Sequence, residues 1–253
     1  MPSTKVQFEN REGKTLSGRL DLPEGETRAF ALFAHCFTCS KDSLAASRVA
    51  RGLMERGIGV LRFDFTGLGE SEGDFDSTSF GSNMHDLQDA AAWLGANHAL
   101  PAMLIGHSLG GAAVLGVASS MPSVKAVATI GAPADPAHVS HLFESKLEEI
   151  QREGAAEVSL GGRPFRIGKV FLDDLEAQDP QRLIAGLGVP LMIFHTPIDT
   201  IVGVENAAQI YQWAHHPKSF ISLDQADHML NNRRDADFVA SMIAAWGERV
   251  LID

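Results

Sequence analysis

The stretch of sequence that decides the fold reads Leu104-Ile105-Gly106-His107-Ser108-Leu109-Gly110-Gly111. The apolar residues before Gly106 predict a buried strand, and the small residues after Ser108 predict a helix that packs close to it. Gly106 and Gly110 leave room for a turn that holds Ser108 in a strained conformation, with its hydroxyl exposed over the sheet. The first N–H groups of the helix face the same point, where negative charge develops in acyl transfer. We interpret Ser108 as a nucleophile.

Length and composition restrict the class of protein. The chain has 253 residues, 45% of them hydrophobic and 21% charged, which suits one large α/β domain over residues 1–253. The net charge of −11 argues against nucleic acid or an anionic membrane surface as a partner. No apolar run approaches the ~20 residues that span a bilayer, and no signal peptide is evident. We therefore expect a cytoplasmic protein.

Strands and helices alternate along most of the chain. Val6–Phe8 and Thr15–Leu22 predict an N-terminal hairpin. The other predicted strands are Ala29–Ala34, Gly59–Asp64, Met103–Ile105, Val124–Ile130, Pro190–His195 and Ser219–Leu223, and the predicted helices are 42–56, 80–97, 109–121, 204–214 and 235–250. Such alternation predicts an α/β fold with a mostly parallel central sheet and helices on both faces.

The pattern changes between about residues 134 and 185, which we interpret as a small cap inserted into the sheet domain. The cap has a predicted helix at His141–Arg152, a hairpin at Val158–Ile167 and a short helix at Phe171–Ala177. Its apolar residues are candidates for a pocket lining, and we expect half of them to pack between cap and sheet instead; they are Leu142, Phe143, Leu147, Ile150, Phe165, Phe171 and Leu172. A cap this small predicts a preference for short and medium acyl chains.

A serine hydroxyl needs a histidine to take its proton and a carboxylate to orient that histidine. We expect both partners after late strands, at the same edge of the sheet as Ser108. His228 follows the strand 219–223 and Asp199 follows the strand 190–195, so the chain order is that of a known type of triad. We assign His228 as the base and Asp199 as the acid. Asp135, after the strand 124–130, is the alternative acid.

Other residues near these positions are less suited to catalysis. Asp227 adjoins His228, but neighbours in an extended loop point apart. The side chain of His107 should diverge from that of Ser108, and His195, just inside a strand end, is expected to be structural.

An oxyanion hole needs two N–H groups. We assign one to Leu109, directly after the nucleophile, and the other to Phe37, in the loop that follows the strand Ala29–Ala34. The glycine-containing loop 64–69 is expected to be a structural turn, because Gly-x-Gly without a third glycine is a weak nucleotide signal.

The only cysteines, Cys36 and Cys39, flank Phe37. They are too few for a secreted disulfide framework, and two ligands alone do not make a zinc site. We expect packed thiols in a reducing compartment. The alternative is a redox pair, in which a disulfide swings the Phe37 N–H away from the oxyanion and acts as an off-switch.

Three segments together carry a family resemblance: 34–42 (Ala-His-Cys-Phe-Thr-Cys-Ser-Lys-Asp), 62–73 (Arg-Phe-Asp-Phe-Thr-Gly-Leu-Gly-Glu-Ser-Glu-Gly) and 106–111. The chain resembles the α/β-hydrolase superfamily over nearly its whole length. More narrowly, it resembles the hydrolase half of bacterial proteins that join an α/β-hydrolase to an OsmC-like thiol peroxidase domain. Two features depart from that pattern: Cys36 stands where most relatives have glycine, and the chain stops at Asp253, so we expect no peroxidase half here.

The resemblance implies an esterase-like serine hydrolase with no cofactor and no metal, acting on a small-molecule ester. A peptidase or amidase on the same triad is the alternative among enzymes, and a non-catalytic binding module that kept the fold is the alternative from another class. A homodimer is compatible with the sequence.

Overall fold

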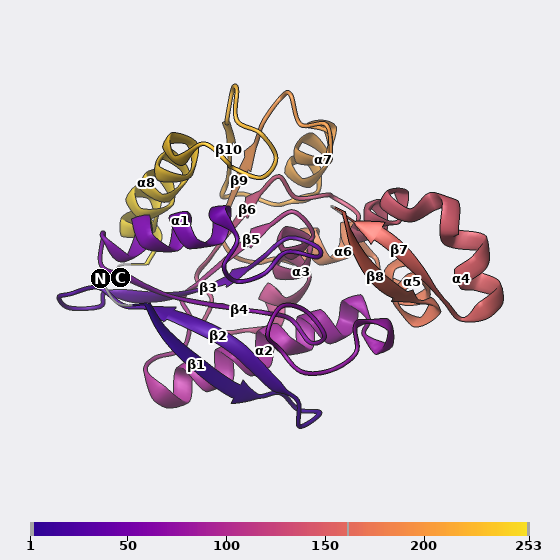
Figure 1. Ribbon diagram of the computed structural model, residues 1–253. Helices are drawn as coiled ribbons and strands as arrows, with labels where there is room; N and C mark the ends of the chain where they lie inside the picture. The colour runs from indigo at the N-terminus through magenta and orange to yellow at the C-terminus, as the bar shows by residue number, and fades with distance from the viewer. Residues whose placement is uncertain (1–2, 161, 252–253) are drawn as a thin grey trace.

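The computed structural model describes residues 3–160 and 162–251, and within them an eight-stranded sheet forms the centre of the molecule (Figure 1). In chain order the strands are β1 (Ser3–Glu9), β2 (Thr15–Asp21), β3 (Ala29–Ala34), β4 (Ile58–Phe63), β5 (Met103–His107), β6 (Ala126–Ile130), β9 (Leu191–His195) and β10 (Lys218–Ser222). Their order across the sheet is β1-β2-β4-β3-β5-β6-β9-β10. β2 pairs antiparallel with β1 and β4, and the other pairs are parallel. The predicted hairpin and mostly parallel sheet are confirmed.

Helices cover both faces of the sheet. On one face α1 (Leu44–Met54) packs against α8 (Arg233–Val250). The other face carries α2 (Phe80–Asn97), α3 (Leu109–Val117), α6 (Pro180–Ala185) and α7 (Glu205–Trp213). Successive strand residues divide between the two faces: Leu32 packs with the α2 and α3 side, whereas Phe33 packs with the α1 and α8 side. Burial on both faces explains why the central strands are continuous apolar runs.

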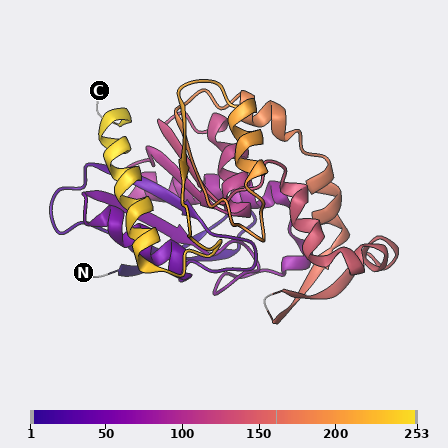
Figure 2. The ribbon, with the colours of Figure 1, turned by 90° about the horizontal axis from the view of Figure 1, so that it is seen from above.

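The chain between β6 and β9 leaves the sheet, and we call residues 134–185 the cap segment. It contains the 3₁₀ segment η3 (Pro136–Lys146), α4 (Leu147–Glu153), the antiparallel hairpin β7 (Ala155–Leu160) and β8 (Arg163–Gly168), and α5 (Lys169–Glu176), and it ends in α6, which returns to the sheet face beside α3 and α7. Figures 1 and 2 both place the hairpin and α4 at one side of the sheet, far from α8. The hairpin forms where the sequence predicted it.

The predicted helix His141–Arg152 is wrong in its first half. The structure has a 3₁₀ segment there, and an α-helix begins only at Leu147. Phe143 interrupts the helical backbone with φ −138° and ψ 30°, and its side chain is buried in the core at 3% exposure. Tertiary packing of this aromatic ring therefore overrides the local helical pattern. None of the described helices is long and apolar enough to cross a membrane.

Candidate active site

Ser108 occupies the turn between β5 and α3, and its backbone is in the left-handed half of conformational space with φ 54° and ψ −126°. The two glycines around it are required by close packing. A Cβ on Gly106 would lie 2.3 Å from the carbonyl oxygen of Gly110, and a Cβ on Gly110 would lie 2.4 Å from that of Ala34. Any side chain at either position would push α3 away from β3 and β5. The turn predicted from the sequence is present, with Ser108 at its apex.

Asp199 and His228 form a short hydrogen bond at the ends of β9 and β10. The Nδ1 of His228 lies 2.7 Å from Oδ2 of Asp199. The other carboxylate oxygen accepts the N–H groups of Ile201 and Val202, each at 2.9 Å. Burial alone would raise the pKa of Asp199, but the hydrogen bonds from His228 and from these two N–H groups outweigh it and lower the pKa. Asp199 is therefore a buried carboxylate, ionised at neutral pH and locked in orientation.

Ser108 and His228 meet at one cavity. It has a volume of about 530 Å³ and both side chains line it. Ser108 is 8% and His228 9% exposed, so each reaches the cavity with only a small part of its surface. Within the described residues their side chains are not hydrogen-bonded to each other. Such contacts often tighten only when substrate binds.

The alternative candidates lie elsewhere. Asp135 is exposed and accepts the N–H of Ala137 at 2.8 Å, where it caps η3. Asp227 accepts the N–H of Met229 at 2.9 Å and holds the shape of the loop rather than the ring of His228. The structure therefore brings Asp199, and neither of these two, to the imidazole.

Three buried histidines surround the site. His107 places its Nε2 2.7 Å from the carbonyl oxygen of His228, and His195 places its Nε2 2.7 Å from that of Val202. Burial, with the charge of His228 as a smaller cause, lowers the pKa of His107 to about 3. Burial also lowers the pKa values of His195 and His35. All three are neutral at pH 7 and brace the loops that carry Asp199 and His228 or the start of the loop after β3.

The two candidate oxyanion residues, Phe37 and Leu109, line the same cavity as Ser108. Within the described residues neither backbone N–H donates a hydrogen bond, so both are available to a ligand. The ring of Phe37 stacks on Phe171 with ring centroids 5.6 Å apart and also contacts Phe75. The cap segment therefore packs on the loop that would supply one of the two donors.

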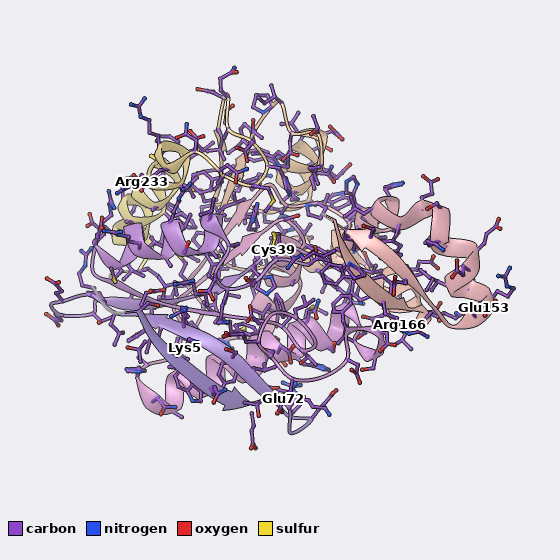
Figure 3. All side chains as sticks on the ribbon, viewed as in Figure 1. Lys5, Cys39, Glu72, Glu153, Arg166 and Arg233 are labelled. Atoms are coloured by element: carbon purple, nitrogen blue, oxygen red, sulfur yellow. A yellow bond between two sulfur atoms is a disulfide. The ribbon has the colours of Figure 1, made fainter. Side chains whose placement is uncertain are left out.

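The expectation of packed thiols is wrong, because Cys36 and Cys39 form a disulfide with their Cα atoms 5.3 Å apart. The bond closes a tight turn in which the N–H of Cys39 donates to the carbonyl oxygen of Cys36 at 3.1 Å. Thr38, the third residue of this turn, has φ 60°. A turn that already brings its first and fourth Cα atoms together places two cysteines within bonding reach. Figure 3 shows Cys39 near the centre of the molecule, where the loops of the sheet meet the cap segment.

An ion cluster that the sequence analysis missed anchors the loop after β3 at its C-terminal end, beyond Cys39. Asp64 accepts the backbone N–H and the Nζ of Lys41, both at 2.6 Å, and the N–H of Glu70 at 2.9 Å. The Lys41 side chain is 1% and that of Asp64 0% exposed. Burial would lower the pKa of Lys41, but its hydrogen bonds to Asp64 and Glu70 raise it. The loop 64–69 is thus a structural support, as predicted, and its partner is 23 residues away in sequence.

The cavity wall differs from the predicted lining. Of the seven apolar cap residues proposed, only Leu142 reaches the cavity. Phe143, Ile150, Phe171 and Leu172 are buried in the core instead. The wall also includes residues that the sequence analysis did not name, such as His138, Ser159 and Arg163 on the cap segment and Met229 beside His228. In the described residues no group of three or more His, Cys, Asp or Glu side chains is arranged to hold a metal ion.

Residues 31–241 match the alpha/beta hydrolase family, and the chain belongs to that family. It is 51% identical to the esterase domain from a Rhodothermus marinus protein, with a TM-score of 0.82 and 100% of each chain covered. Est1E from Butyrivibrio proteoclasticus, solved with ferulic acid, is 17% identical with a TM-score of 0.78 over 97% of this chain and 99% of that one, which shows a shared fold. The uncharacterized protein YfhR of Salmonella typhi is 24% identical over 180 residues. That alignment covers 70% of this chain and 57% of YfhR, so the chain spans little more than half of that relative. The predicted α/β-hydrolase fold is confirmed.

Proposed function

We propose that this protein hydrolyses carboxylic esters of small molecules through a Ser108–His228–Asp199 triad and an acyl-enzyme. One observation carries the proposal: His228, held by a short hydrogen bond to the buried Asp199, lines the same cavity as the strained Ser108. The 51% identity to a protein titled an esterase domain supports the ester as the bond that is cleaved.

The chemistry proceeds in two halves. His228 Nε2 takes the proton of Ser108 while Oγ attacks the ester carbonyl, and the N–H groups of Leu109 and Phe37 stabilise the oxyanion. His228 then returns the proton to the departing alcohol, which leaves an acyl group on Ser108. His228 then deprotonates a water molecule, which attacks the acyl carbonyl. The bond between the acyl carbon and Oγ of Ser108 breaks, His228 returns the proton to Oγ, and the carboxylic acid leaves. Asp199 keeps the proton on Nδ1, so that Nε2 is free to act as the base.

Amide hydrolysis on the same residues is the alternative reaction, and a binding module that kept the fold is the alternative role. The triad residues favour catalysis over binding alone, since a binding role would not require the Asp199 carboxylate to hold His228 beside Ser108. A panel of p-nitrophenyl esters and matched p-nitroanilides separates these possibilities. We expect ester turnover that Ser108→Ala abolishes. Anilides cleaved as fast as esters would favour the amidase, and turnover of neither would favour the binding module.

A further inference from the structure

The cavity beside Ser108 has one charged side chain outside the proposed triad whose role is unexplained. Of the residues that the structure describes, seventeen line the cavity; none of these is Asp or Glu, and Arg163 is the only Lys or Arg among them. The protein as a whole carries a net charge of −11, so a wall that has a guanidinium and lacks carboxylates departs from the rest of the chain. A guanidinium without a carboxylate among its neighbours in the wall is suited to meet an anionic group.

Arg163 is held in place without an acidic partner. It begins β8, and its Nη2 donates to the carbonyl oxygen of Thr38 at 2.6 Å. Its guanidinium carbon lies 5.5 Å from the ring centroid of Phe165. Across residues 3–160 and 162–251 no carboxylate forms an ion pair with it. One bond to a carbonyl uses one of five N–H donors, so most of the guanidinium remains available.

The neighbouring residues complete a polar corner in an otherwise apolar wall. Ser159 lies on β7 in the same hairpin and lines the cavity, and its side chain is exposed. The second imidazole in the wall, His138, has its Nε2 3.0 Å from the carbonyl oxygen of Ile201. Among the described residues of the wall Arg163 is the one Lys or Arg side chain, and its planar fork matches a carboxylate.

We infer that Arg163 is a specificity-determining residue that binds a carboxylate on the substrate, so that the preferred ester carries an anionic group apart from the bond that is cleaved. This inference rests on the proposed ester hydrolysis and specifies its substrate class. A guanidinium at the cavity wall, with its other face on Phe165, would hold the carboxylate while Ser108 attacks the ester carbonyl. The interaction is made with substrate and transition state alike, so it lowers KM more than it raises kcat.

The test compares Arg163→Met with wild type on matched anionic and neutral esters. One arm places the carboxylate on the acyl group: 4-nitrophenyl hydrogen glutarate against 4-nitrophenyl pentanoate. The other arm places it on the leaving group: 4-acetoxybenzoate against its methyl ester. The measured quantity is the ratio of kcat/KM in wild type to that in the variant. In at least one of the two arms we expect this ratio to be about tenfold larger for the anionic ester than for its neutral partner, as suits an exposed charge-assisted contact.

Arg166→Met is the matched control. Arg166 lies on the same strand, pairs with Asp76 at 2.8 Å and does not line the cavity. Figure 3 shows it on the cap segment, well apart from Cys39. Arg166→Met removes the same charge as Arg163→Met but away from the cavity, so we expect equal ratios for anionic and neutral esters. Arg163→Lys keeps the charge without the fork and should recover part of the preference.

Several outcomes would overturn the inference. Equal losses on anionic and neutral esters in both arms would mean that Arg163 only supports the loop through Thr38. If Arg166→Met lost the preference for anionic esters as much as Arg163→Met does, the preference would reflect the overall charge of the protein and not contact with Arg163. Failure of the proposed function appears differently, as neutral ester turnover no faster in wild type than in Ser108→Ala. Calorimetry of glutarate binding to Ser108→Ala, with and without Arg163→Met, would then decide the subsite independently, and equal affinities would reject it.

Discussion

Replacing Asp199 by asparagine should disable the base without disturbing the fold, and the hydrogen bonds show why. Oδ1 accepts two N–H groups, from Ile201 and Val202, while Oδ2 accepts Nδ1–H of His228. An asparagine must place its carbonyl oxygen at the position of Oδ1, because its NH₂ group there would oppose two donors. The NH₂ group then faces Nδ1 of His228. The ring can accept that bond only by moving its proton to Nε2, which in the proposed mechanism is the atom that takes the proton of Ser108.

This change of tautomer should lower kcat by roughly 10³–10⁴, which corresponds to about 4–5.5 kcal/mol of transition-state stabilisation. The assay is steady-state hydrolysis of p-nitrophenyl butyrate, with thermal unfolding as a check that the variant is folded. Asp135→Asn is the control and should keep wild-type kcat, because Asp135 is exposed and caps η3. The reasoning is refuted if Asp199→Asn stays within about tenfold of wild type or if Asp135→Asn loses as much.

Three further predictions concern acid stability, the disulfide and chain length. Burial lowers the pKa values of His35, His107 and His195, so below pH ~6.5 these histidines bind protons in the unfolded chain but not in the folded one. The free energy of unfolding should therefore fall with decreasing pH by up to about 1.4 kcal/mol per pH unit for each histidine. Urea titrations that give the same free energy of unfolding at pH 7 and pH 5 would contradict this. Because the Phe37 N–H is unused in the disulfide form, reduction or Cys39→Ser should change kcat by less than about threefold, whereas a gain of ~10²–10³ on reduction would establish the off-switch. Acyl chains of about C2 to C8 should be preferred, since each added CH₂ gains ~0.8 kcal/mol only while the cavity has room; best activity on long-chain emulsions would refute this.

The elements that carry the site were predictable because their signals are local. The apolar run before Gly106 and the small residues after Ser108 marked β5 and α3, and the bounds predicted for the helix Phe80–Asn97 are those of α2. The positions of Asp199 and His228 followed from a rule about strand ends. These features depend on neighbours in sequence or on a common edge of the sheet.

The features that escaped prediction depend on distant packing. The 3₁₀ geometry around Phe143 arises because its ring is buried in the core, which no helical pattern reveals. The Lys41–Asp64 pair joins two loops, and the contact of Arg163 with Thr38 joins residues 125 positions apart. The disulfide depends on a turn with Thr38 at positive φ, a conformation that is rare for a β-branched residue.

The most direct test of the central claim is to locate the nucleophile chemically. The folded protein is treated with a fluorophosphonate, and the intact mass and the modified peptide are determined by mass spectrometry. Our account predicts one adduct, on Ser108, with complete loss of esterase activity, and no adduct in Ser108→Ala; His228→Ala should label far more slowly, because the serine then lacks its base. An adduct on another residue, or full ester turnover by Ser108→Ala, would contradict the assignment of Ser108 as the nucleophile.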